Sequence, residues 1–311
     1  MPGSDSEDRF GSGKGRGIRN RKIREAIYQR YRQAKAERKS EKRRQQAEEE
    51  KADPSKRVER LANNVPKTQE NTREHDETYV DEDDQEVEDD QEQDEFAPYF
   101  SGQAPKVLIT TSRCATAIAN QFGKELETIF PNSKFVRRGS GYTIEQIIQF
   151  CNNREYTDTI VLHEDRRKLF ALTIIHLPEG PTAHFKLSNP ESMYSLDENV
   201  VITPHHPELI LNNFTTRLGH SVGRFFAALF PQVPEFQGRQ VATFHNQRDF
   251  IFFRRHRYDF VSGERANLKE IGPRFTLRLR WLQKGPYNPS HGEFEWSFKP
   301  AMETSRRRFF L

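Results

Sequence analysis

The sequence predicts an α/β protein made of two similar α/β halves and preceded by a charged N-terminal arm. Three observations lead to this prediction. An apolar strand, a turn and an amphipathic helix occur twice, about 100 residues apart, in "KVLITTSR…ETIFP" and "ELILNNF…AALFP". Further apolar runs of strand length follow each copy. The composition also changes at residue 96, where a highly charged segment gives way to segments rich in aromatic and aliphatic residues.

Residues 1–95 form the predicted arm, whose net charge is −5 against +8 for residues 96–311. Within the arm, segment 14–57 is basic, rich in helix formers, and has only a thin apolar stripe of Ile23, Ile27 and Tyr31. We expect this basic helix to form against RNA or an acidic partner, although a solvated charged arm also fits. Its basic clusters are typical of nuclear or nucleolar targeting segments.

Segment 74–95 of the arm is an acidic block with 14 Asp or Glu residues and no Lys or Arg. Like charges at this density repel one another and extend the chain. We interpret the block as a disordered spacer. A contact for basic proteins, or a screen that covers the basic surface until RNA displaces it, are the alternatives.

The first half is predicted over residues 105–190. Its first strand contains residues 107–109, Ser112 is placed to cap the following helix, and Pro131 ends that helix. The apolar face of the helix comprises Ile118, Phe122, Leu126, Ile129 and Phe130. A second helix in "GYTIEQIIQFCNN" and three strands in "DTIVLHED", "KLFALTIIHLP" and "GPTAHFKLSN" complete this half.

The second half is predicted over residues 205–285, within a domain that spans 96–290 and ends in a basic C-terminal extension, 291–311. Thr215 or Thr216 is placed to cap its helix, whose apolar face is Leu218, Val222, Phe225, Phe226 and Leu229. The segment "QVATFHNQRDFIFFRRHRYDF" predicts a hairpin that turns at 246–249. In "RFTLRLRWL", alternation places Phe275, Leu277, Leu279 and Trp281 on the core face and Arg278 and Arg280 on the other face.

The strand predicted over residues 250–260 begins apolar on both faces and ends basic on both. We therefore expect it to leave the core and emerge on a positive surface through Arg254, Arg255 and Arg257, where arginine binds phosphate and aromatic rings stack on bases. Alternatively, these arginines pair with Asp259, Glu264 or Glu270. Arg137 and Arg138 precede a glycine loop, and Arg113 is expected at a helix N-terminus that favours phosphate.

Motifs for chemistry are weak in this sequence. The segment "GSGKGRG" lacks the spacing of a phosphate-binding loop, and neither "GYT" nor "GHS" is a nucleophile elbow. His205 and His206 have no further ligands at zinc spacing, and the two cysteines are far apart. The chain has no apolar run of 18 residues and no secretory signal. We expect no enzymatic activity, no cofactor, no metal and no membrane association.

The segments "LITTSR", "FHNQRDFIFFRRHRYDF" and "EIGPRFTLRLRWLQKG", together with the doubled α/β unit, resemble the Brix-domain family of ribosome-assembly factors over residues 105–290. The resemblance implies two halves similar to the anticodon-binding domain of some aminoacyl-tRNA synthetases. It also implies a non-catalytic protein of the nucleolus that binds pre-ribosomal RNA. The candidate RNA-binding residues are Arg113, Arg137, Arg138, Arg248, Arg254, Arg255, His256, Arg257, Arg278, Arg280 and Lys284.

The expected function is that of an rRNA-binding assembly factor for the large (60S) ribosomal subunit. It would stabilise folded pre-rRNA in early nucleolar particles and support pre-rRNA processing. Its expected partners are pre-rRNA, a dedicated second assembly factor in a heterodimer, and other pre-ribosomal proteins. The alternative is a protein-interaction module whose basic strand docks an acidic partner, with RNA contact incidental.

Overall fold

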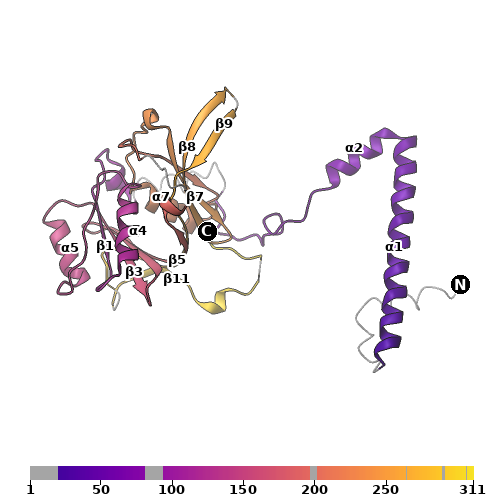
Figure 1. Ribbon diagram of the computed structural model, residues 1–311, viewed down its shortest axis with the longest axis horizontal. Helices are drawn as coiled ribbons and strands as arrows, with labels where there is room; N and C mark the ends of the chain where they lie inside the picture. The colour runs from indigo at the N-terminus through magenta and orange to yellow at the C-terminus, as the bar shows by residue number, and fades with distance from the viewer. Residues whose placement is uncertain (1–19, 81–93, 197–201, 264, 289–290, 306) are drawn as a thin grey trace. The chain divides into compact units, whose positions relative to one another are not determined.

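The computed structural model describes residues 20–80, 94–196, 202–263, 265–288, 291–305 and 307–311 (Figure 1). The chain divides into two compact units, residues 1–71 and residues 72–311. In the part of the chain that is described, no helix has both the length and the apolar character needed to span a membrane. The centre of the predicted acidic block, residues 81–93, lies outside the described residues.

The described residues of the first unit form two helices, α1 (Arg21–Ala52) and α2 (Pro54–Asn63), with no buried residue in either. The Asn20 side chain caps α1 by accepting hydrogen bonds from the N–H groups of Lys22 and Ile23. Asp53 ends α1 and caps α2 through the N–H of Ser55. The predicted basic helix is therefore present from residue 21, although it is interrupted at Asp53, and residues 14–19 lie outside the described residues.

The second unit is built on an 11-stranded sheet, in which nine strands follow the order β2-β1-β3-β4-β5-β10-β8-β7-β6, while β9 pairs with β8 and β11 with β10. The pairs β1–β2, β1–β3 and β6–β7 are parallel, and the other pairs are antiparallel. The strands are β1 (Val107–Thr111), β2 (Ser133–Phe135), β3 (Asp158–Asp165), β4 (Lys168–His176), β5 (Thr182–Glu191), β6 (Glu208–Asn212), β7 (Gln240–Gln247), β8 (Phe250–Ser262), β9 (Arg265–Glu270), β10 (Arg274–Gln283) and β11 (Phe294–Ser297). Its helices are α4 (Ala117–Glu127), α5 (Ile144–Asn152), the short α6 (Met193–Leu196) and α7 (Arg217–Ala227), with 3-10 turns at Ala97–Phe100, Phe236–Gly238 and Pro300–Met302.

One face of the sheet carries a single hydrophobic core shared by both halves. Helices α4 and α7 both pack on this face. The Phe122 ring of α4 meets Phe275 edge-on at 5.9 Å, and the Phe226 ring of α7 stacks on Phe244 at 4.4 Å. The residues that follow the two helices also meet, with the Phe130 and Phe230 rings 5.5 Å apart. The two halves are therefore one packing unit, in agreement with the predicted α/β fold.

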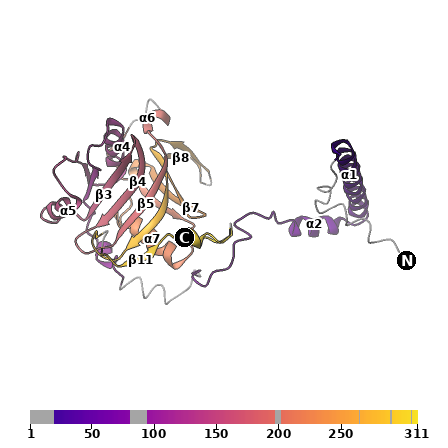
Figure 2. The same ribbon diagram turned by 90° about the horizontal axis from the view of Figure 1, so that it is seen from below.

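In the described part of the chain, the opposite face is covered by an α-helix only in the first half. Figure 2 shows α5 beside β3. Ile148 and Cys151 of α5 pack with Leu108 of β1, Val161 of β3 and Ile175 of β4 in a second, smaller cluster. The helix begins with a capping box between Thr143 and Gln146. The predicted second helix of the first half is thus confirmed, with its apolar side on the sheet.

The start of α4 differs from the prediction. The helix begins at Ala117 after Thr116, so Ser112 is not its cap. The Thr116 side chain makes no capping bond within the helix. Instead, its N–H and hydroxyl both donate to the Glu164 carboxylate of β3 at 2.7 Å. Ile118 is exposed rather than part of the apolar face, and it lies in the first turn of α4, before the buried residues of the helix.

The end of β10 also differs from the prediction. Its register against β5 shifts between Leu279 and Trp281, which indicates a β-bulge at Arg280. A bulge reverses the faces of all residues after it. Leu282 therefore joins the core, whereas Trp281 lies partly exposed and stacks on His184.

The compact unit is wider than the predicted 96–290 domain. The Arg73 guanidinium donates to the Thr215 hydroxyl at 2.9 Å and to the Phe309 carbonyl at 3.2 Å. Asp94, at the end of the acidic block, accepts two bonds from Arg224 of α7 at 2.7 and 2.8 Å. Residues 294–297 form β11, and Leu311 is buried in the core. Residues on both sides of the predicted domain are thus part of the fold.

Candidate nucleic-acid interface

Strand β8 carries the largest group of candidate RNA contacts, and the structure separates them. Arg255 is only 1% exposed. Its guanidinium donates to the Thr128 hydroxyl at 3.0 Å and to the Gln240 side-chain carbonyl at 2.5 Å. Burial, with a smaller effect of Arg257, lowers the pKa of Arg255 to about 10. The expectation that Arg255 emerges on the surface is wrong, since the core extends further along β8 than its apolar residues do.

Arg254 and His256 lie on the other face of β8 and are partly exposed. The Arg254 guanidinium is 3.7 Å from the Glu270 carboxylate of β9, so it is engaged in an ion pair. Asp259 pairs with Arg239 at 2.6 Å, and Glu264 lies outside the described residues. The alternative of ion pairing therefore holds in part for this strand.

The C-terminal residues cover the arginines of β10. The Arg278 guanidinium pairs with Glu303 and lies over the Phe250 and Phe298 rings, at 5.1 and 4.8 Å. Arg280 lies over the same Phe298 ring at 4.9 Å. The predicted pair of arginines on an open sheet face is thus corrected: the segment predicted as an extension folds back across them.

The remaining candidates of the second half are dispersed. Arg248 lies exposed in the β7–β8 turn, Arg257 is partly buried along β8, and Lys284 is exposed just after β10. Arg248 and Arg257 both take part in interactions within the chain. These residues contribute positive charge, but nothing gathers them around a common cavity.

In the first half, the predicted candidates do come together. Arg113 is exposed in the loop before α4, and Arg137 and Arg138 follow β2. Burial, and then the like charge of Arg113, lower the pKa of Arg138, so these two cations are electrostatically coupled. Arg113 does not lie at a helix N-terminus, however, because Glu164 already occupies the start of α4.

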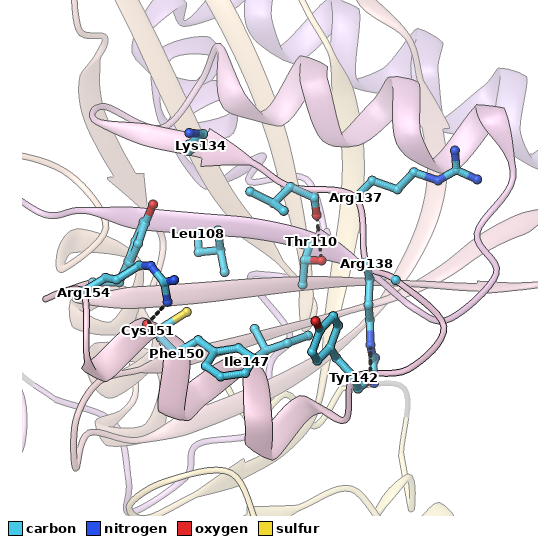
Figure 3. Close-up of a pocket in the computed structure, with 13 residues that line it drawn as sticks. Leu108, Thr110, Lys134, Arg137, Arg138, Tyr142, Ile147, Phe150, Cys151 and Arg154 are labelled. Carbon is cyan, nitrogen blue, oxygen red and sulfur yellow. Dashed lines mark hydrogen bonds between the residues drawn. The ribbon is translucent and has the colours of Figure 1, made fainter.

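A cavity of about 550 Å³ adjoins these cations between β1, β2 and α5 (Figure 3). Leu108, Ile147 and Cys151 form its apolar side, Lys134 lies on β2, and Arg154 and Arg138 stand at opposite ends. Three aromatic residues also line it, namely Tyr142, Phe150 and Tyr156. None of its 13 lining residues is an acid. Cations around aromatic rings are typical of surfaces that bind single-stranded nucleic acid.

Sequence reasoning found Arg137 and Arg138 but missed Lys134, Tyr142, Phe150 and Arg154. The available signal was the pair Phe150 and Arg154, which are four residues apart and therefore adjacent on a helix. The Arg154 guanidinium indeed lies 6.0 Å from the Phe150 ring and donates to the Phe150 carbonyl at 3.1 Å. The approach of β2 to α5, which closes the cavity, has no local signal in the sequence.

A second cavity, of about 570 Å³, has the opposite character. Its polar lining includes Glu95, Glu155 and Glu179, with Tyr99 and no Lys or Arg. It does not suit phosphate. In the described part of the chain, no cluster of three or more His, Cys, Asp or Glu side chains has the geometry to hold a metal ion.

These observations define a class of protein: one with a large α/β sheet, two strand–helix–strand units and a basic, aromatic-lined edge. The family model described as "Brix domain" matches residues 112–281, and the chain belongs to the Brix-domain family. Ribosome production factor 1 of Xenopus laevis is 53% identical over 79% of this chain and 73% of its own length. Ribosome production factor 1 of Saccharomyces cerevisiae is 44% identical, with 94% of this chain and 97% of that protein covered.

Among solved structures, a protein from Aeropyrum pernix K1 described as a probable ribosomal biogenesis protein aligns with 61% of this chain and 99% of its own. The TM-score of this alignment is 0.43, and the sequence identity is 14%.

Proposed function

We propose that this chain is a non-catalytic ribosome-assembly factor that binds pre-rRNA of the large subunit. The similarity to ribosome production factor 1 over almost the full length of the Saccharomyces cerevisiae protein supports the role in ribosome assembly. We expect the protein to act in the nucleolus, in early particles of the 60S subunit.

The observation that carries the RNA-binding part is the group of five cations beside the aromatic-lined cavity of the first half: Arg113, Lys134, Arg137, Arg138 and Arg154. Phosphates of a nucleic acid provide the affinity of such a surface, because binding releases condensed counterions. The net charge of +8 over residues 96–311 favours the same ligand class. The binding is expected to weaken steeply with salt.

The test is a salt titration of the full chain with fragments of large-subunit pre-rRNA. The variant Arg113→Gln with Arg137→Gln removes two exposed cations without touching the core. We expect its affinity to fall about tenfold. The logarithmic salt slope should fall by about one for each phosphate that the variant no longer neutralises.

The matched control is Lys124→Gln with Lys168→Gln, which removes two exposed cations from α4 and β4. Its affinity should stay near that of the unaltered protein. If this control and the Arg113→Gln, Arg137→Gln variant bind RNA with equal affinity, RNA does not bind at the cations beside the cavity. Crosslinking in cells, followed by sequencing of the RNA, then locates the rRNA element that is bound.

A second candidate function, docking of a partner assembly factor, is favoured by the β8–β9 hairpin, which projects from the sheet (Figure 1). Phe260 and Leu268 are each 63% exposed on this hairpin, and the Tyr258 ring contacts Phe260 at 5.3 Å. Projecting apolar side chains of this kind mark protein contacts.

The test of this second function is purification of the full chain from cells after nuclease treatment. A stoichiometric partner that is retained by the unaltered chain and absent with Phe260→Ser and Leu268→Ser would support docking. Retention by the variant would exclude the hairpin as the docking surface.

A further inference from the structure

The cavity of the first half is concave and lined by aromatic rings, and neither feature is needed to bind phosphate alone. Its rings are exposed although they flank a concave site: Tyr142 is 52% exposed and Phe150 is 42% exposed. The two rings meet edge-on, with centroids 5.7 Å apart, so the outer face of each remains available for stacking. Figure 3 shows both rings on the α5 side of the cavity, opposite Lys134 and Leu108.

The arginines at the ends of this cavity are fixed by backbone contacts. The Arg138 guanidinium donates twice to the Tyr142 carbonyl, at 3.1 and 2.8 Å, and so closes the loop that contains Gly139 and Gly141. Arg154 is held in the same way by the Phe150 carbonyl at 3.1 Å. Each guanidinium thus positions the residue that carries one of the two rings. Each guanidinium also keeps its positive charge, which lies at one end of the cavity.

We propose that this cavity binds one unpaired nucleotide of an RNA strand, with the base against Tyr142 and Phe150 and the flanking phosphates near Lys134 and Arg154. A cavity of about 550 Å³ lies in the range of small-ligand sites. Bases in a duplex are stacked and expose only their edges, whereas an unpaired base offers a face to an aromatic ring. This inference rests on the proposed RNA-binding function and adds the kind of RNA element that the site selects.

The experiment measures binding of the full chain to three labelled probes of equal length. The probes are a single-stranded oligouridine, an abasic strand with the same number of phosphates, and a fully paired RNA duplex. The variants are Phe150→Ala and Tyr142→Ala. The matched controls are Phe170→Ala and Tyr194→Ala, whose rings are 44% and 53% exposed outside the cavity. A thermal melt checks that each variant folds.

We expect each cavity variant to bind the oligouridine roughly 5- to 100-fold more weakly, which is the effect of losing one stacked base. Binding of the abasic strand should change by less than twofold, since no base is present to stack. The duplex should be equally insensitive. Both control variants should match the unaltered protein on all three probes.

The outcomes separate this inference from the proposed function. If the unaltered chain binds none of the probes, both fail. If it binds RNA but the cavity variants behave like their controls, only the unpaired-nucleotide site fails. Equal losses for the oligouridine and the abasic strand would also overturn it, because the cavity would then bind phosphate alone. A photoreactive side chain at Tyr142 that captures a protein in cells, and no RNA, would overturn it in favour of a peptide site.

Discussion

The two halves repeat a strand, a helix and a strand, but they complete this plan differently. In the first half, β2 lies outside β1 at the edge of the sheet, and α5 covers the face opposite the core. In the second half, β7 lies inward of β6, and the C-terminal residues cross the corresponding face. The side chains follow this difference. Under α5 the second face carries Leu108, Val161 and Ile175, whereas the other half carries Arg254, His256 and Arg278.

The comparison teaches that a strand's second face depends on what covers it. A helix over the sheet requires apolar residues on both faces, while a face left to loops and solvent takes polar ones. It also separates the two candidate surfaces. The cavity exists where a helix meets the edge of the sheet, whereas Arg254 and Arg278 of the second half form ion pairs with Glu270 and Glu303.

The largest expected effect tests whether the main core stabilises both halves, while the smaller cluster under α5 stabilises mainly that helix. Phe226→Ala should lower the free energy of unfolding of the whole 72–311 unit by about 3–5 kcal/mol. Ile148→Ala should cost about 2 kcal/mol, the low end for such a change, because Ile148 retains some exposure. Denaturant titration measures both. Hydrogen exchange should rise throughout the sheet in the first variant and mainly in α5 in the second, and equal patterns would contradict the distinction.

The next effect distinguishes two neighbouring arginines of β8. Arg255→Gln should destabilise the fold by about 2–3 kcal/mol, since the shorter side chain leaves the buried Gln240 carbonyl and Thr128 hydroxyl without their donor. Arg254→Gln removes a partly exposed pair with Glu270 and a hydrogen bond to the neighbouring Phe253 carbonyl, and should cost about 1 kcal/mol or less. Thermal melts of both variants provide the comparison. A similar loss of stability at the two positions would show that the buried hydrogen bonds of Arg255 contribute no more to stability than the exposed ion pair of Arg254.

A smaller effect contrasts two tight hairpin turns, one between β3 and β4 and the other between β7 and β8. Both central residues of each turn have positive φ: 48° and 64° at Arg166 and Arg167, and 56° and 63° at Arg248 and Asp249. Two-residue type I′ turns require this conformation. Asp249 also accepts the N–H groups of Phe310 and Leu311, at 2.7 and 2.9 Å.

Glycine at both turns isolates that contact. Asp249→Gly should destabilise the fold by about 2 kcal/mol, because two N–H groups no longer have a charged acceptor. Arg167→Gly should be neutral or stabilising by up to about 1 kcal/mol, because glycine adopts positive φ without a steric cost. Denaturant midpoints compare the variants, and a similar loss of stability at both turns would show that the loss at Asp249 does not come from the C-terminal contact.

A pH-dependent effect concerns one face of the sheet in the first half, where His163 of β3 and His184 of β5 flank Thr173 of β4. Burial lowers the pKa values of His163 and His184 to about 4, and both rings bond the Thr173 hydroxyl at 2.8 Å. The unfolded chain takes up protons near pH 6.5, which the folded chain resists until about pH 4. Stability should therefore decrease as the pH falls from 6.5 to 4 and stay flat with respect to these groups above about 7. In His184→Gln the decrease should be shallower, and an unchanged profile would assign it to other groups.

The sequence predicted the fold well where periodicity is local and failed where distant segments meet. The helix over 217–227, its cap at Thr216 and the turn of the β7–β8 hairpin are all confirmed. The start of α4 was missed because its capping carboxylate, Glu164, is 48 residues away. Trp281 and Leu282 exchanged faces because a bulge has no signature in an alternating pattern. Arg255 reads as a surface residue because its partners lie on β7 and just after α4.

The two partners of Arg255 also show how the halves are joined. Thr128 belongs to the first half, whereas Gln240 and Arg255 belong to the second, so one guanidinium spans the junction from inside the core. If the halves were separate chains, this would be a buried hot spot at the centre of a dimer interface, with Phe130 and Phe230 as its aromatic contact. The two halves are therefore arranged like the subunits of a dimer, but they share one core and are expected to unfold together. Each half lacks the other's side of a single core, and neither is expected to be a stable protein alone.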